Sequence, residues 1–358
     1  MMKTYKIAAI PGDGIGREVV PAATTVLDAV AARSGFTLAW EQFDWGSQHY
    51  FDHGQMMPSD AIDRLRPFDA IFFGAVGDPR IQDNVTLNGL LLPIRRAFDQ
   101  YACVRPAVLY EGVRCPLAGK TPGAIDFVVV RENTEGEYAQ VGGVLYPDNP
   151  HGVAVQSAIF TRHGTERVIR FAFELARRRG KKQLVTSVTK SNAQGFSMTF
   201  WDTVFAEVAR EYPDLRTESL LVDAACMDLV RRPESFDVIV ASNLFGDILT
   251  DLSAAITGSL GLAPSANLNP SREFPSMFEP VHGSAPDIVG RGVANPMAQM
   301  LSGVMMLDFI GEAAAAVALE RAVLDVLAEG QDVTPDLGGT ATTARVTEAV
   351  LARVQGGR

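Results

Sequence analysis

The sequence predicts an α/β protein with substantial parallel strand pairing, because short apolar runs alternate with segments of helical periodicity. Its 358 residues leave room for two domains at roughly 150 residues each, or for one large α/β unit. The predicted strands lie at 6–10, 70–73, 127–130, 184–188 and 238–240, and the predicted helices follow at 17–33, 192–211 and 246–257.

Two further segments have helical character. Thr165–Arg179 carries apolar residues at helical spacing and ends in three arginines before Gly180, which places cations at the negative end of a helix and a glycine at its stop. The segment 313–328 is apolar but interrupted by charged residues, which favours a helix of a folded core. By contrast, 262–276 is rich in Pro, Ser and Asn without periodicity and is predicted to be a long ordered loop.

The composition and net charge of the chain limit the kinds of partner that it can bind. The chain is 47% hydrophobic and 21% charged, as in folded globular proteins, and its net charge of -10 disfavours nucleic acid and anionic membranes. No window is long and apolar enough for a membrane span. Its three cysteines lack CxxC spacing, which argues against a disulfide framework or a zinc site and fits the reducing cytoplasm.

The first predicted strand runs into Pro11-Gly12-Asp13-Gly14-Ile15-Gly16. This GxGxG spacing differs from the GxGxxG of a Rossmann turn, and no acidic residue stands about twenty residues further on. No Walker A motif is present either. The glycines indicate a tight strand-to-helix turn with positive φ, and a ligand-facing loop is an equal alternative.

Acidic residues suggest a divalent cation. Asp247 and Asp251 are four apart after a predicted strand, so on a helix they share one face about 6 Å apart along the axis. Asp223 stands where another apolar run ends and is a plausible third ligand. Oxygen donors of this kind suit Mg²⁺ or Mn²⁺, although such an Asp pair is more often a solvated surface feature.

Arginines at the ends of predicted elements suggest an anionic substrate. Arg95, Arg105 and Arg131 could together clamp a small dianion, since each guanidinium can grip a carboxylate with two donors. The alternative for each is a pair with a neighbouring acid. Lys190 follows the run 184–188, where a nearby metal would lower its pKa toward that of a general base, although most lysines are simply solvated.

Together these segments resemble the metal-dependent β-decarboxylating dehydrogenases, the family of isocitrate and isopropylmalate dehydrogenases. The resemblance runs nearly end to end and implies an isopropylmalate-dehydrogenase-like two-domain fold with a large mixed sheet, not a Rossmann fold. It further implies that 1–100 and 255–358 form the larger, cofactor-binding domain and 101–254 the smaller domain with the dimer interface and metal ligands. The segments that carry the resemblance are Pro11–Gly16, the segment with Arg95 and Arg105, Arg131–Tyr138, Lys190–Asn192, Ser242–Asp251 and Glu279–Asp287.

The resemblance also assigns roles. Lys190 takes the proton from the substrate hydroxyl, and Tyr138 protonates the enol carbon after decarboxylation. Lys190 and Asp223 reach into the partner subunit's site of a homodimer. NAD is expected rather than NADP, because Asp287 falls at the ribose hydroxyls and would repel a 2′-phosphate. The resemblance places the substrate carboxylates on Arg95, Arg105 and Arg131, the metal on Asp223, Asp247 and Asp251, and the cofactor on His282, Gly283, Ser284, Ala285, Asp287 and Asn295.

Positions at which this sequence differs from related enzymes limit the choice of substrate. Isopropylmalate enzymes usually have a Glu where Asn88 stands and a Val where Ala193 stands, and isocitrate enzymes have a Ser and an Asn where Gly89 and Leu91 stand. A four-carbon diacid remains, and segments such as Phe98–Tyr101 resemble the branch that oxidises tartrate and decarboxylates D-malate to pyruvate. K⁺ helps that branch, but no motif marks its ligands.

Three rivals stay open. The first alternative is that the chain is a 3-isopropylmalate dehydrogenase, in which case the inference from Asn88 and Ala193 is wrong. Mg²⁺-dependent phosphoryl transfer also uses clustered Asp and Lys, but the sequence has no phosphate cradle. A catalytically inactive regulatory subunit of a heteromeric dehydrogenase would keep the fold, but the presence of Tyr138, Lys190 and the three Asp disfavours it.

Overall fold

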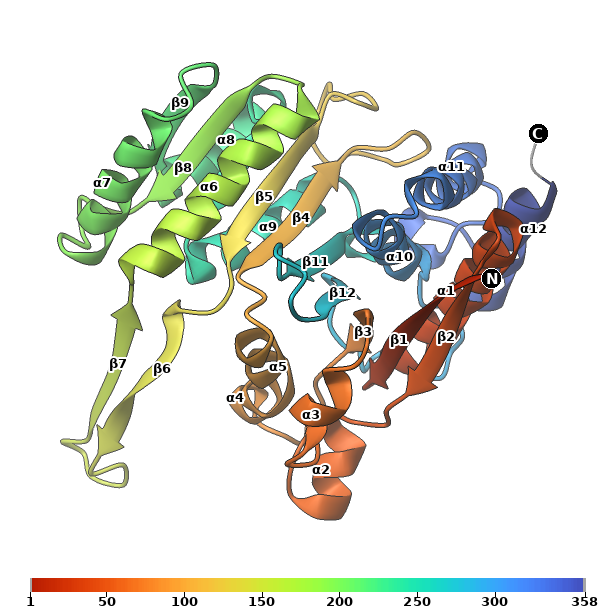
Figure 1. Cartoon of the computed structure of the whole chain (residues 1–358), viewed down its shortest axis with the longest axis horizontal. Helices are drawn as coiled ribbons and strands as arrows, with labels where there is room; N and C mark the ends of the chain where they lie inside the picture. Colours follow the sequence, from red (N-terminus) through yellow and green to blue (C-terminus); the bar gives the residue numbers. More distant parts are fainter. Residues whose placement is uncertain (1, 357–358) are drawn as a thin grey trace. The chain divides into compact units, whose positions relative to one another are not determined.

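A computed structural model describes residues 2–356 and contains two compact units. Unit 1 comprises Met1–Gln100, Arg105–Ile125 and Ala254–Arg358, and unit 2 comprises Tyr101–Val104 and Asp126–Ser253. Within residues 2–356, ten strands form a mixed sheet in the order β2-β1-β3-β12-β11-β4-β5-β10-β8-β9, and β6 and β7 form a second sheet (Figure 1). The predicted α/β class with a large mixed sheet is confirmed.

The secondary structure has the following bounds. The strands are β1 (Lys3–Gly12), β2 (Phe36–Gln42), β3 (Ala70–Ala75), β4 (Ala102–Val108), β5 (Asp126–Glu132), β6 (Gly136–Leu145), β7 (Val153–Ile159), β8 (Leu184–Thr189), β9 (Arg216–Leu221), β10 (Val238–Ala241), β11 (Pro264–Leu268) and β12 (Ser276–Pro280). The α-helices are α1 (Gly16–Ser34), α2 (Ser47–His53), α3 (Ala61–Leu65), α4 (Asp83–Thr86), α5 (Leu92–Ala97), α6 (Arg162–Arg179), α7 (Ser197–Ala209), α8 (Val222–Arg231), α9 (Asn243–Ile256), α10 (Met297–Phe309), α11 (Ala313–Glu329) and α12 (Thr343–Gly356). Short turns are the π-helical η1 (Leu87–Leu91) and the 3₁₀ turns η2 (Pro233–Ser235), η3 (Leu260–Leu262) and η4 (Pro335–Leu337).

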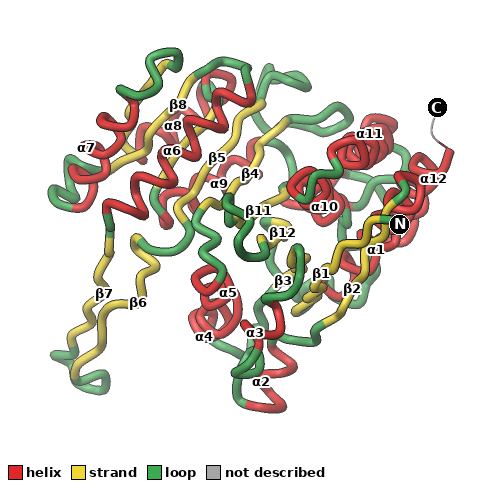
Figure 2. The backbone as a smooth tube through the Cα atoms, in the orientation of Figure 1, coloured by secondary structure: helices red, strands yellow, loops and turns green. Residues whose placement is uncertain are grey.

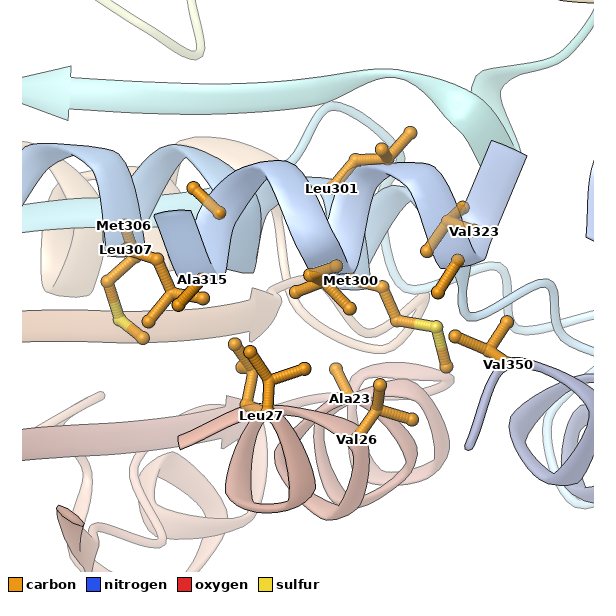
Figure 3. Close-up of a cluster of buried hydrophobic side chains, with 14 of the residues drawn as sticks. Ala23, Val26, Leu27, Met300, Leu301, Met306, Leu307, Ala315, Val323 and Val350 are labelled. Carbon is orange, nitrogen blue, oxygen red and sulfur yellow. The ribbon is translucent and has the colours of Figure 1, made fainter. Parts of the chain in front are cut away.

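Unit 1 is built on β1, which pairs in parallel with both β2 and β3, while β12 is parallel to β3 and antiparallel to β11. Helices α1, α10, α11 and α12 pack together beside this sheet (Figure 1). Leu27 and Val26 of α1 meet Met300 of α10 and Val350 of α12 in a buried apolar cluster (Figure 3). This core supports the part of the sheet from which the loops after β1, β3 and β12 emerge.

Unit 2 contains four parallel strands in the order β5-β10-β8-β9. Helix α6 packs on β5, β10 and β8, and beside α7. Arg131 and Val188 both pair with Ala241, so the carboxyl ends of β5, β10 and β8 lie at one edge of the sheet. In open α/β sheets this edge is where ligands bind.

The β6–β7 arm, residues 136–159, is an antiparallel two-stranded sheet of its own (Figure 2). Its strands carry exposed apolar side chains, among them Val144, Leu145 and Val155. An isolated two-stranded ribbon is marginally stable in water. The arm therefore presents apolar side chains that are exposed to solvent in this chain.

Most predicted elements are present, and one prediction is wrong. The helices predicted at 165–179 and 313–328 are α6 and α11. The predicted loop at 262–276 contains β11, because Pro264–Leu268 is pinned by antiparallel pairing with β12 and lies in the interior. Burial and pairing override the weak strand propensity of these residues. The helix predicted at 192–211 begins only at Ser197.

None of the helices within residues 2–356 has the length and apolar character that crossing a membrane requires.

Candidate active site

Gly12 at the end of β1 (φ +69°) and Gly14 just beyond it (φ +54°) make a tight turn with positive φ, which is one of the two predicted alternatives. A Cβ on Gly14 would lie 2.0 Å from the carbonyl oxygen of Ser284, and one on Gly12 would lie 2.0 Å from that of Ala75. Close approach of backbone to backbone therefore explains these glycines. The turn holds the loop after β12 in place, since Ile15 N donates to Ser284 O at 3.0 Å.

Arg95 of α5 is buried in unit 1 and paired with a buried acid. Its Nη2 donates to Glu279 Oε1 at 2.7 Å, and Asn267 Nδ2 donates to the same oxygen at 2.7 Å. Only 4% of the Arg95 side chain and 7% of the Glu279 side chain are exposed. Arg95 Nε is buried without a hydrogen-bond partner among residues 2–356, which leaves one donor for a ligand.

Two more predicted substrate residues belong to unit 1. Arg105 of β4 is buried, and its Nε donates to Ser265 Oγ at 3.3 Å. Asn88 lies on the π-helical turn η1 and donates from Nδ2 to Asn84 O at 2.7 Å, while its Oδ1 is buried without a partner in the described chain. Such turns occur frequently at functional sites.

Unit 2 brings Arg131, Tyr138 and Asp247 together beside the carboxyl ends of its strands. Arg131 Nη1 pairs with Asp247 Oδ1, and the Tyr138 hydroxyl donates to Asp247 Oδ2 at 2.9 Å. The Arg131 guanidinium also lies over the Tyr138 ring, 5.3 Å from its centroid. Asp247 is one-third exposed, whereas only 3% of the Arg131 side chain is.

Asn243, the first residue of α9, completes this cluster. Its Oδ1 accepts from Arg131 Nε at 3.1 Å and from Nη2 at 2.8 Å. Close packing sets the geometry, because a Cβ on Gly246 would lie 2.6 Å from Arg131 Cβ and Cγ. Asp251 follows Asp247 by one turn of α9 and is exposed.

Lys190 and Asp223 form a second pair in unit 2. Lys190 Nζ donates to Asp223 Oδ1 at 2.6 Å, and 28% and 64% of the two side chains are exposed. The Lys190 ammonium lowers the pKa of Asp223. Among residues 2–356, no group of three His, Cys, Asp or Glu side chains is arranged to hold a metal. The structure thus does not gather Asp223, Asp247 and Asp251 into one centre within this chain.

The predicted cofactor residues follow β12 in unit 1. Ser284 is buried, Gly283 and Asp287 are exposed, and Ala285 has a φ of +43°. The buried His282 Nε2 has no hydrogen-bond partner within the described residues. Burial lowers the pKa of His282, although its contact with the Gly283 carbonyl and the charge of Asp336 act in the opposite direction.

Asn295 is engaged within unit 1. Its Oδ1 accepts from Met297 N at 3.0 Å at the start of α10, and its Nδ2 donates to Asp336 Oδ2 at 3.0 Å. This side chain organises the loop before α10 in addition to any contact with a ligand.

Sequence reasoning missed the partners of the predicted residues. Glu279, Asn243 and Asp336 hold Arg95, Arg131 and Asn295, respectively. The available signal was weak: Glu279 ends an apolar run, Met277-Phe278, and a charged residue in such a place needs a buried partner.

Comparisons with known proteins identify the family of the chain. Residues 6–350 match the model of the isocitrate/isopropylmalate dehydrogenase family. The chain is 53% identical over 357 residues to D-malate dehydrogenase [decarboxylating] of Escherichia coli (strain K12), covering 98% of each protein. It is 49% identical over 355 residues to tartrate dehydrogenase/decarboxylase of Pseudomonas putida, covering 97% of each. The crystal structure of isocitrate dehydrogenase from Methylococcus capsulatus superimposes with a TM-score of 0.89 at 38% identity, over 98% of this chain and 99% of that one.

Proposed function

Because the chain belongs to the isocitrate/isopropylmalate dehydrogenase family, we propose that it is an NAD-dependent and divalent-metal-dependent dehydrogenase of tartrate, D-malate or both. D-malate would lose its 3-carboxylate and give pyruvate. The cluster of Arg131, Tyr138 and Asp247 carries the proposal, since it joins an anion-binding cation, a proton donor and a metal-binding carboxylate in one contact network.

A small diacid suits the substrate residues. Arg95, Arg105 and Arg131 are all buried guanidiniums, and buried cations of this kind favour a carboxylate that completes their hydrogen bonding. The unused Arg95 Nε donor and the unused Asn88 Oδ1 acceptor, each buried, suit a carboxylate and a hydroxyl of the substrate, respectively.

The environment of Gly89 argues against a third carboxylate. A Cβ on Gly89 would lie 2.5 Å from Met56 Cγ, and Met56 is buried in an apolar cluster with Leu91. A serine at residue 89 would thus clash with Met56. This supports the four-carbon diacid over isocitrate.

The donors also fit the cofactors. Asp247 and Asp251, with Asp223 of a second subunit, offer oxygen ligands for Mn²⁺ or Mg²⁺, which would polarise the substrate hydroxyl and stabilise negative charge on its oxygen. The buried, unpartnered His282 Nε2 and the exposed Asp287 suit the adenosine half of NAD, whose nicotinamide half would accept the hydride. The sequence marks no ligands for K⁺, and the reducing cytoplasm stays the expected compartment.

Two side chains would move protons. Lys190, in its neutral form, would take the hydroxyl proton of the substrate as a general base. Tyr138 would donate its hydroxyl proton to the enol carbon after CO₂ leaves, and Arg131 and Asp247 keep that hydroxyl oriented.

We further propose a homodimer whose sites are shared. Exposed apolar residues border the relevant side chains: Met227 lies on α8 after Asp223, and Ile248 follows Asp247 on α9. The β6–β7 arm adds more of this surface. Large exposed apolar surface of this kind marks protein interfaces.

Shared sites can be tested by complementation. Two tagged variants, Lys190→Ala and Tyr138→Ala, would be inactive alone, and their co-purified heterodimer would regain about half of wild-type activity because one of its two sites is intact. A heterodimer as inactive as the two parents would rule out sharing.

The assay of function is NADH formation at 340 nm with Mn²⁺ and K⁺, with D-malate, L-tartrate, meso-tartrate, 3-isopropylmalate and isocitrate tested in parallel. Turnover of D-malate or tartrate supports the proposal. Turnover of 3-isopropylmalate alone would make this a 3-isopropylmalate dehydrogenase. No turnover of any substrate would favour an inactive regulatory subunit of a heteromeric dehydrogenase.

A further inference from the structure

The segment between Arg131 and Tyr138 contains three glutamates, and each has a different set of partners. Glu132 is buried, and its Oε1 accepts from Thr134 N and Thr134 Oγ1, both at 2.8 Å. Asn243 Nδ2 lies 3.4 Å from Glu132 Oε2. Glu132 thus folds the segment onto itself.

Glu135 contacts the start of α6. Its two carboxylate oxygens accept from the backbone N and the Oγ1 of Thr161, each at 2.8 Å, and Thr161 Oγ1 in turn accepts from Gly164 N at 2.9 Å. Helix α6 carries none of the residues assigned to substrate, metal or proton transfer. Glu135 therefore has a structural task.

Glu137 makes the same two kinds of hydrogen bond at the start of α9, with Ser242 just before the helix and Leu244 in its first turn. Its Oε1 accepts from Ser242 Oγ at 2.8 Å, and its Oε2 accepts from Leu244 N at 3.1 Å. The first N–H groups of a helix have no partner within the helix, and a carboxylate at this end is favoured by the helix dipole. Asp247 lies on the next turn of this helix.

We infer that Glu137 is a positioning residue that fixes the first turn of α9 relative to Tyr138, and thereby sets Asp247 for the metal. Glu137 directly precedes Tyr138 in sequence, and the Tyr138 hydroxyl reaches Asp247 at 2.9 Å. The side chains of Glu137 and Tyr138 thus connect this segment to α9 at two points, Leu244 and Asp247. The inference rests on the proposed function, because it requires Asp247 to be a metal ligand.

Glu135 supplies a matched control. Glu137→Ala and Glu135→Ala each remove one hydrogen bond from a backbone N–H and one from a hydroxyl at the start of a helix. The readouts are the Kd of Mn²⁺, from electron paramagnetic resonance of the free ion, the Kd of NAD, and hydrogen exchange of the Leu244 amide.

Glu137→Ala is expected to weaken Mn²⁺ binding by about 10- to 100-fold, the usual effect of losing a residue that orients a ligand. It should also speed exchange at Leu244 while leaving the Kd of NAD unchanged. Glu135→Ala should leave the Kd of Mn²⁺ and exchange at Leu244 as in the wild type. Glu137→Gln keeps an oxygen acceptor and should recover part of the Mn²⁺ affinity, and it serves as the test if Glu137→Ala does not fold.

Equal Mn²⁺ affinity in Glu137→Ala and the wild type, or equal losses in the two alanine variants, would overturn the inference. Asp247→Asn separates this failure from failure of the proposed function. If Asp247→Asn binds Mn²⁺ as the wild type does, the ligand assignment is wrong and the inference falls with it. If Asp247→Asn loses Mn²⁺ while Glu137→Ala keeps it, only the positioning role is wrong.

Discussion

Arg131 and Lys190 stand at the same edge of one sheet, yet their surroundings are opposite. Arg131 is the second-to-last residue of β5 and Lys190 directly follows β8, and these strands flank β10. The Arg131 side chain is 3% exposed and is held by Asn243 and Asp247, whereas Lys190 is accessible and has Asp223 as its partner. The chain thus buries one cation among its own partners and leaves the other partly exposed, which fits the proposed shared site.

The largest expected effect comes from replacing Lys190, the partly exposed cation. Lys190→Ala should lower kcat by about 10³-fold, because a general base contributes about 10² to 10⁴. The Kd of NAD, measured by fluorescence titration, should stay as in the wild type because the predicted NAD residues belong to unit 1. Wild-type turnover in this variant would refute the proposed base.

The inward-facing pairs should dominate stability. Glu279→Gln leaves the buried Arg95 charge without its anion, so the free energy of unfolding should fall by about 3 kcal/mol in urea titrations. An unchanged midpoint would mean that Arg95 rearranges to find another acceptor. Glu273→Gln, an exposed glutamate of the same unit, is the control.

The two pairs of unit 2 allow a direct comparison. Asp247→Asn removes the anion beside buried Arg131 and should cost about 2 kcal/mol, less than a fully buried pair because Asp247 is one-third exposed. Asp223→Asn should leave the Tm unchanged, since exposed ion pairs contribute little. Equal Tm changes in the two variants would contradict the contrast between the pairs.

The smallest effect is a pH dependence. Burial lowers the pKa of His282 below its ordinary value of 6.5, so the folded chain favours the neutral ring. Its contribution to stability is therefore present above about pH 6.5 and is lost as the pH falls below that value. Unfolding at pH 7.5 and 5.5 should show a smaller pH dependence in His282→Gln than in the wild type. Parallel losses in both proteins would place the acid sensitivity elsewhere.

Sequence reasoning reached the residues of the site more readily than their contacts. Tyr138 and Asp247 stand in recognisable segments, and the structure brings them within 2.9 Å. Arg95 and Glu279 are 184 positions apart, so neither periodicity nor local spacing could predict their pairing. The strand β11 was missed for the same reason, because its partner β12 and its burial decide its conformation.

The exposed β6–β7 arm has a consequence for how activity depends on the concentration of the protein. If the arm and the apolar residues of α8 and α9 are covered only by a second copy of the chain, activity per molecule will depend on protein concentration. Dilution would then inactivate the protein by mass action, without any change in temperature or pH. When a cell makes more of this chain, total activity would then rise more steeply than the number of chains, because a larger fraction of them is dimeric.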